Sequence, residues 1–264
     1  MTTQLAEKAE DYLHRLCVDI TARHTGSAGN RAATDFFAAT VAAFGFAVET
    51  PPFDCIDWVE SGADLAVGDA VFQVKVSPFT LGGAARAPLM VVSTVAELEA
   101  AGIAGKIVLL RGEIAQGQLM PKNFPFYNPD EHKHIIHLLE TRGPQAIVAA
   151  TARDPDRVGS GAYPFPLIED GDFAVPSVYM TDEEGERLAG YAGREAVLTI
   201  RAQRIPATGC NVIARKVGSG PGRIVLFAHI DARLGTPGAS DNASGTVVLL
   251  LLATIASLTS TLSS

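Results

Sequence analysis

Residues 227–245 have the sequence FAHIDARLGTPGASDNASG, and this stretch decides how the fold is interpreted. The apolar run 223–228 just before it is typical of a strand, and the apolar residues after it predict a buried helix. His229 and Asp231 therefore come at the end of a strand, and Asp241 lies between that strand and the helix. In α/β sheets, ligands bind beyond the carboxyl ends of the strands, so chemistry is expected here.

Three side chains of this stretch have the chemistry of a metal site. Imidazole nitrogen and carboxylate oxygen are ligands that zinc takes in catalytic sites, so His229 and Asp241 are candidate metal ligands. A carboxylate two residues after the histidine can accept the second ring N–H and fix the tautomer, which is the role expected of Asp231. Gly235 and Gly238 allow the sharp turn that would bring Asp241 back beside His229.

A purely structural interpretation is open for each residue by itself. His229 can be a histidine at a strand end, and Asp241 can be the N-cap of the last helix, because aspartate is a common capping residue. The two together, in the spacing His-x-Asp and then Pro-Gly-Ala-x-Asp-Asn-x-Ser-Gly, favour the metal site.

This pattern resembles the zinc-dependent exopeptidases of metallopeptidase family twenty-eight, the aminopeptidase and glutamate carboxypeptidase group. The resemblance implies an α/β fold in which helices sandwich a mixed, mostly parallel sheet. It also implies that His229 binds one zinc ion, that Asp231 is the catalytic residue orienting it, and that Asp241 bridges two zinc ions. The expected activity is that of an aminopeptidase, hydrolysing peptide or aminoacyl substrates with water activated by zinc.

The first part of the chain also resembles this family. Thr25-Gly-Ser-Ala-Gly-Asn30 is similar to the family's Gly-Ser-x-x-Asn loop, although a helix cap and nothing more explains it equally well. Apolar spacing predicts an amphipathic helix over 4–22, a second helix up to Phe44, and a strand over 46–50.

The middle of the chain has a different composition, which predicts an inserted domain. We expect 1–57 and 205–264 to form an incomplete zinc exopeptidase domain, and 58–204 to form a small α/β insertion. A hairpin is predicted over 64–76, and a long Gly/Pro-rich loop over 153–172. The insertion resembles a protease-associated (PA) domain, and the segments that carry this resemblance are 105–112, 143–148 and 174–179.

The other ligands that the resemblance implies do not follow Asp241. A Glu-Glu pair, another acidic ligand and a late histidine are expected there, but none of the 23 residues after Asp241 is Asp, Glu or His. We therefore expect a C-terminally truncated catalytic domain, cut short by truncation or a frameshift near residue 250, that binds zinc weakly or not at all and is inactive. The alternative is a non-catalytic protein whose PA-like domain binds peptides or another protein.

Composition limits the partners and the location. The net charge of -8, with no basic stripe, argues against nucleic acid. Three cysteines without CxxC spacing predict reduced, buried thiols. The N-terminus lacks the apolar core of a signal peptide, so a cytoplasmic chain is expected. The apolar run 247–253 predicts a buried helix, and a membrane span is the less favoured alternative.

A second metal site over His132, His134 and His137 is also conceivable, because the last two can share one face of a helix. Their spacing is not the i, i+4 pair of His-Glu-x-x-His enzymes. A solvated helix face is the favoured interpretation.

Overall fold

The computed structural model describes residues 2–20, 22–152, 164–218, 220 and 222–261. The chain divides into two compact units, the split unit (Met1–Asp57 with Ile205–Ser264) and the inserted unit (Trp58–Arg204). The divisions fall at the same residues as the predicted boundaries. Each lies inside a long strand, since β2 spans Pro52–Val67 and β9 spans Glu195–Cys210. Two statements about these units stay predictions. They are that the inserted unit is PA-like and that the split unit is an incomplete zinc exopeptidase domain.

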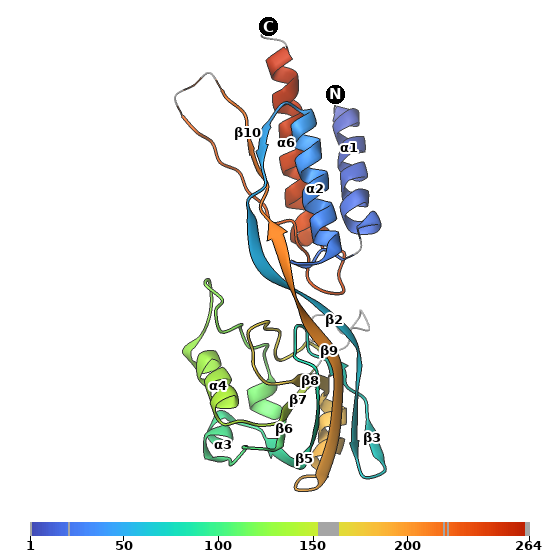
Figure 1. Ribbon diagram of the computed structural model, residues 1–264, viewed down its shortest axis with the longest axis vertical. Helices are drawn as coiled ribbons and strands as arrows, with labels where there is room; N and C mark the ends of the chain where they lie inside the picture. The colour runs from blue at the N-terminus through green and yellow to red at the C-terminus, as the bar shows by residue number, and fades with distance from the viewer. Residues whose placement is uncertain (1, 21, 153–163, 219, 221, 262–264) are drawn as a thin grey trace. The chain divides into compact units, whose positions relative to one another are not determined.

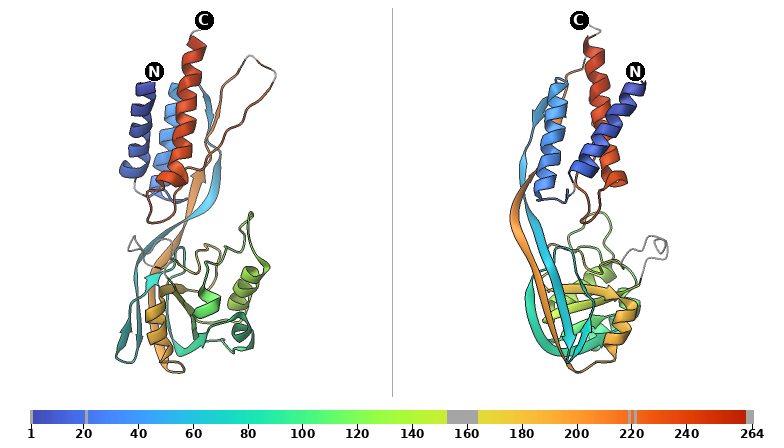
Figure 2. Two further views of the ribbon diagram at one scale, coloured as in Figure 1. Left: turned by 180° about the vertical axis from the view of Figure 1, so that it is seen from behind. Right: turned by 90° about the vertical axis from the view of Figure 1, so that its right-hand side faces the viewer.

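Helices α1, α2 and α6 lie side by side in the split unit (Figures 1 and 2). Helix α1 spans Thr2–His14 and continues into the π-helical turn η1 (Arg15–Asp19). Helix α2 spans Ala28–Ala43, and helix α6 spans Ser244–Thr261. Strands β1 (Ala47–Glu49) and β10 (Ile213–Arg215) pair antiparallel. The predicted helices and the strand over 46–50 are confirmed in type, with the first helix ending at Asp19.

One face of α6 forms part of the core of the split unit. Val247, Leu250 and Ala253 recur at helical spacing and are buried. Val248, Leu252 and Ile255 lie on the other side, each at least 41% exposed. By length and composition alone, Ala239–Ser257 could cross a membrane, and 33% of that stretch is buried.

The predicted strand over 223–228 is wrong. The residues form no regular secondary structure, and Ile224 and Phe227 are 88% and 92% exposed. A strand is defined by hydrogen bonds to a neighbour, and among the described residues none pairs with this segment. Residues 211–215 do not pair with this segment either, since β10 pairs with β1, and Ser219 and Pro221 between the two segments lie outside the described residues.

The inserted unit is built on a mixed sheet. Its described strands have the order β3-β2-β9-β5-β6-β7-β8-β4. Neighbours from β5 to β8 are parallel, whereas β3, β9 and β4 pair antiparallel. The bounds not yet given are β3 (Ala70–Phe72), β4 (Lys75–Val76), β5 (Gly83–Val92), β6 (Ile107–Leu110), β7 (Ala146–Thr151) and β8 (Ser177–Thr181). The predicted α/β class, with a mixed sheet flanked by helices, is confirmed.

Helices cover the parallel strands. Every residue of β6 and β7 is buried. They are α3 (Val95–Ala100), the 3-10 turn η2 (Gly112–Ala115), α4 (Asp130–Thr141) and α5 (Asp182–Ala189). Thr94 and Thr181 cap α3 and α5. The hairpin is confirmed where Leu65 pairs with Phe72. Beyond it, β4 pairs with β8 instead. Of the loop over 153–172, 164–172 has no regular structure and 153–163 lies outside the described residues.

The prediction of buried cysteines needs a correction. Cys17, Cys55 and Cys210 are free but only half-buried. Even so, desolvation raises the pKa of the Cys55 thiol, against a hydrogen bond from the Gly209 backbone that lowers it. Their reduced state agrees with the absence of any disulfide among them.

Candidate metal centre

The structure brings His229, Asp231 and Asp241 together. Nδ1 of His229 lies 3.2 Å from Oδ1 of Asp231, and Nε2 lies 2.9 Å from Oδ1 of Asp241. Each ring nitrogen therefore contacts a different carboxylate, as the proposed division of roles requires. All three side chains are open to solvent, with 51%, 44% and 89% of their surface exposed.

The start of α6 fixes the positions of this group. Asn242 Oδ1 accepts from the Gly245 N–H at 3.0 Å, so the residue after Asp241 makes the capping contact. The Thr246 hydroxyl donates to the His229 carbonyl at 3.2 Å. The interpretation of Asp241 as the N-cap is therefore wrong, because its carboxylate faces His229 while Asn242 caps the helix.

A glycine turn carries Asp241 back toward His229. Gly238 has φ +56°, a left-handed conformation that favours glycine. A Cβ on it would lie 2.5 Å from Ala232 Cβ and 2.9 Å from the Asp241 carbonyl oxygen. The turn continues through a bond from the Ala243 N–H to the Gly238 carbonyl at 2.9 Å. The predicted role of Gly238 in a sharp turn is thus confirmed.

Arg23 is a buried residue of this centre that the sequence did not reveal. Its side chain is among the largest that are fully buried, and it donates to the backbone carbonyls of Ile230, Pro237 and Gly238, as well as Leu16. An arginine just before a loop is common, so its position in the sequence does not indicate that its side chain is buried. Only the chain's return after about two hundred residues brings these carbonyls to it.

The Gly-Ser-x-x-Asn loop does more than cap a helix. Ser27 Oγ accepts from the Asn30 N–H at the start of α2, so the capping interpretation is correct. Asn30 Nδ2 also donates to the Arg23 carbonyl at 3.3 Å, and the Ala232 N–H donates to the same carbonyl at 3.2 Å. The loop is therefore joined by hydrogen bonds to the segment after Asp231.

A second histidine–carboxylate pair in the split unit was also missed. His24 Nε2 lies 2.8 Å from Asp57 Oδ1, and both side chains are largely buried. They are 33 residues apart, and no spacing rule relates them. The pair joins the loop after η1 to β2 at the last residue of the split unit before the insertion.

The donor chemistry at His229 and Asp241 fits part of a zinc site. Zinc bonds to histidine nitrogen and carboxylate oxygen are about 2.0–2.2 Å long, so atoms 2.9 Å apart can contact one ion. The set is incomplete, because no group of three or more His, Cys, Asp or Glu able to hold a metal occurs in the described part of the chain.

The histidines of α4 do not form a second centre. His132 Nδ1 accepts from the Met120 N–H at 3.1 Å, and His134 Nε2 lies 2.7 Å from Glu99 Oε1. His134 and His137 are exposed. The favoured interpretation of a solvated helix face agrees with this geometry.

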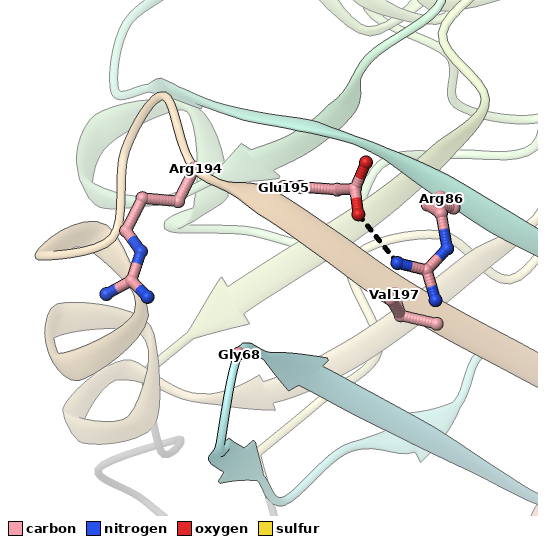
Figure 3. A pocket seen from close by; sticks show the side chains of 5 residues that line it. All are labelled: Gly68, Arg86, Arg194, Glu195 and Val197. Atoms are coloured by element: carbon pink, nitrogen blue, oxygen red, sulfur yellow. Dashed lines mark hydrogen bonds and ion pairs between the residues drawn. The ribbon is translucent and has the colours of Figure 1, made fainter.

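The inserted unit has an open hollow of about 480 Å³, whose lining includes none of His229, Asp231 and Asp241 (Figure 3). It is lined by Gly68, Arg86, Arg194, Glu195 and Val197. Arg86 and Glu195 form an ion pair at 2.6 Å with both side chains more than half exposed. Glu195 supplies the one carboxylate of this lining and is paired with Arg86, and the five residues include no histidine, serine or cysteine.

The part of the chain that carries His229, Asp231 and Asp241 is similar to a known peptidase family. Residues 211–261 match the model of peptidase family M28. The curated Probable lipoprotein aminopeptidase LpqL of Mycobacterium tuberculosis is 25% identical over 240 residues, 86% of this chain and 44% of that protein. The resemblance to this family, predicted from the His-x-Asp and Asp-Asn pattern, is thus confirmed.

Solved structures show the same fold. The aminopeptidase from Aneurinibacillus sp. strain AM-1 has a TM-score of 0.68 at 24% identity, covering 96% of this chain and 59% of that one. BSAP, a zinc aminopeptidase from Bacillus subtilis, has a TM-score of 0.67 at 20% identity, covering 96% and 57%. The chain therefore spans less than two thirds of these relatives.

Proposed function

We propose that this chain supplies the His229, Asp231 and Asp241 part of the active site of a zinc-dependent exopeptidase, most simply an aminopeptidase acting on peptide or aminoacyl substrates. The observation that carries the proposal is the contact of the two ring nitrogens of His229 with two different carboxylates, at 3.2 Å and 2.9 Å. The match to the peptidase family M28 model over 211–261 includes all three residues and supports it.

Each residue has a distinct proposed role. Asp231 accepts the Nδ1–H bond, which leaves the Nε2 lone pair of His229 for a metal ion. Asp241 supplies carboxylate oxygen on the same side, and its second oxygen is available to a second ion. Bound zinc would polarise the scissile carbonyl and lower the pKa of a water molecule. The split unit would therefore hold and orient the metal.

The 264-residue chain by itself is expected to bind zinc weakly and to hydrolyse nothing. One histidine and one carboxylate do not complete a catalytic zinc set, which has three protein ligands and a water. No glutamate able to act as general base follows Asp241 in this sequence.

Zinc titration of the purified chain by calorimetry tests the proposed ligands. We expect weak binding in the unmodified chain, and at least a tenfold loss in His229→Ala and in Asp241→Asn. His134→Ala is the matched control, because His134 also contacts a carboxylate and is exposed, but lies in the inserted unit. Equal zinc affinity in all four proteins would contradict the assignment of His229 and Asp241.

The proposed activity is tested in a protein that carries this chain together with the remaining ligands and the general base of a complete exopeptidase site. Hydrolysis of aminoacyl p-nitroanilides that a chelator abolishes and zinc restores is the expected result. Such a protein that hydrolyses nothing, or whose hydrolysis is indifferent to chelators, would overturn the exopeptidase proposal.

One observation favours the alternative of a peptide- or protein-binding insertion. Phe124, Phe126 and Tyr127 are 40%, 88% and 63% exposed in the loop before α4. Lys122 anchors this loop by donating to Glu140 Oε1 and to the Asp172 carbonyl. Exposed aromatic side chains on a fixed loop are typical of interfaces.

This alternative is separated from the first by fluorescence anisotropy with labelled, unstructured apolar peptides. If it is correct, Phe126→Ala with Tyr127→Ala abolishes binding, and His229→Ala leaves it unchanged. Absence of peptide binding in the unmodified chain would exclude it.

Two expectations about location stay predictions, namely a cytoplasmic chain and no membrane span. The buried face of α6 contacts α1 and α2, which supports a role in the core of the split unit. We expect the expressed chain in the soluble extract, and its recovery in carbonate-washed membranes would contradict this.

A further inference from the structure

We propose that Arg23 is a positioning residue, which sets the distance between the two proposed metal ligands by binding the backbone of both segments that carry them. The proposal rests on the function proposed above for His229 and Asp241. It adds a residue from a distant part of the chain, outside the His-x-Asp and Asp-Asn patterns.

The contacts of Arg23 divide between two segments. Nε donates to the Ile230 carbonyl at 3.1 Å, between His229 and Asp231. Nη1 donates to the Pro237 carbonyl at 2.9 Å, and Nη2 to the Gly238 carbonyl at 3.3 Å, at the turn that leads to Asp241. The rigid, planar guanidinium of Arg23 therefore binds the segment that carries His229 and the segment that leads to Asp241. The facing atoms of these two side chains, Nε2 and Oδ1, are 2.9 Å apart.

The environment of Arg23 explains why an arginine is needed. The residue is 2% exposed, and its side chain donates to backbone carbonyls, including that of Leu16. A buried cation is costly unless it is fully hydrogen-bonded. Guanidinium offers five donors in a fixed fork, whereas the lysine ammonium is a point charge on a flexible stem. A lysine here would keep the charge but lose the simultaneous contacts.

The main chain of Arg23 strengthens the same connection. Its carbonyl accepts from the Ala232 N–H at 3.2 Å and from Asn30 Nδ2 at 3.3 Å. The first turn of α2 is thereby joined to the segment after Asp231. Both the backbone and the side chain of one residue thus fix the loop that carries the candidate ligands.

Two variants and a matched control test this on the whole chain. Arg23→Met removes the donors and keeps the apolar stem, and Arg23→Lys keeps the charge. Arg204→Met is the control, because Arg204 also binds three carbonyls, those of Phe79, Asp170 and Phe173, but within the inserted unit. Zinc affinity by calorimetry and hydrogen exchange over 229–243 are the two measurements.

We expect Arg23→Met to lower zinc affinity 10- to 100-fold, the range seen when groups that support metal ligands from outside are removed. Arg23→Lys should lie between it and the unmodified chain, and both should exchange faster over 229–243. Arg204→Met should change neither. If Arg23→Met does not fold, the zinc affinity and hydrogen exchange of Arg23→Lys alone test the proposal.

Zinc affinity within threefold of the unmodified chain, with unchanged exchange over 229–243 in the folded Arg23 variants, would overturn the proposal. If the unmodified chain binds no zinc at all, calorimetry cannot compare the variants. In that case hydrogen exchange still decides whether Arg23 holds the two segments together.

Discussion

The two residues of the Asp-Asn pair, Asp241 and Asn242, make different contacts. Asp241 directs its carboxylate to His229 Nε2, while Asn242 accepts the Gly245 N–H. A carboxylate engaged as the cap of α6 would be less available to a metal ion. Asn242 therefore caps the helix, and the carboxylate of Asp241 stays free of the helix end and contacts His229.

Gly238 should tolerate substitution less well than Gly235. Both have positive φ, +56° and +75°, but a Cβ on Gly238 would collide with Ala232 Cβ, whereas one on Gly235 meets nothing within 4 Å. Left-handed backbone costs an L-residue about 1–2 kcal/mol, and overpacking adds a further ~1–3 kcal/mol. Urea denaturation should show a larger loss of unfolding free energy for Gly238→Ala. Equal losses would mean that the turn relaxes.

Glu184 makes the stability of the inserted unit depend on pH. Hydrogen bonds from Arg187, and then from the Gln73 N–H, lower the pKa of this carboxyl, against desolvation that raises it. Because the folded-state pKa is lowered, the stabilisation is present above the unfolded-state pKa of about 4.3 and is lost as pH falls through the lower folded value.

Glu184→Gln should therefore cost about 0.5–1 kcal/mol at pH 7 and much less at pH 3. Urea denaturation at both pH values measures this. Exposed Glu131 is the control, for which Glu131→Gln should change stability by less than about 0.5 kcal/mol. A cost for Glu184→Gln that does not depend on pH would contradict the role of its charge.

At the scale of elements, α6 has two faces of similar composition and different surroundings. Leu250 is 0% exposed and Leu252 is 42% exposed. Leu250→Ala should cost about 2–5 kcal/mol because it leaves a cavity, and Leu252→Ala less than about 1 kcal/mol. Thermal unfolding followed by circular dichroism measures the difference. Similar costs would mean that the outer face is also covered in solution.

The segment 223–228 shows the limit of reading an element from composition. Ile224, Val225, Leu226 and Phe227 are all more than half exposed. Their composition signals burial in a sheet, but a strand also needs a neighbour with free backbone groups. Helices depend mainly on bonds within their own segment, which is why α2 and α4 followed the predicted pattern more closely.

At the scale of the whole molecule, the two units have separate cores. Leu139 belongs to the core of the inserted unit, and Leu16 and Leu250 to clusters of the split unit. Leu139→Ala should destabilise by about 2–5 kcal/mol and speed hydrogen exchange within 58–204. Faster exchange in α1 and α2 as well would show that the units unfold together.

The sequence by itself predicted that His229, Asp231 and Asp241 come together, because these residues lie within thirteen positions and a local turn joins them. It also determined the helices with strong periodicity and the domain boundaries. The tertiary structure alone decided the burial of Arg23 among carbonyls some 207–215 residues away, the His24–Asp57 contact, and the absence of a strand at 223–228. Each of these depends on contacts between distant segments, and no local pattern records which distant backbone groups will meet.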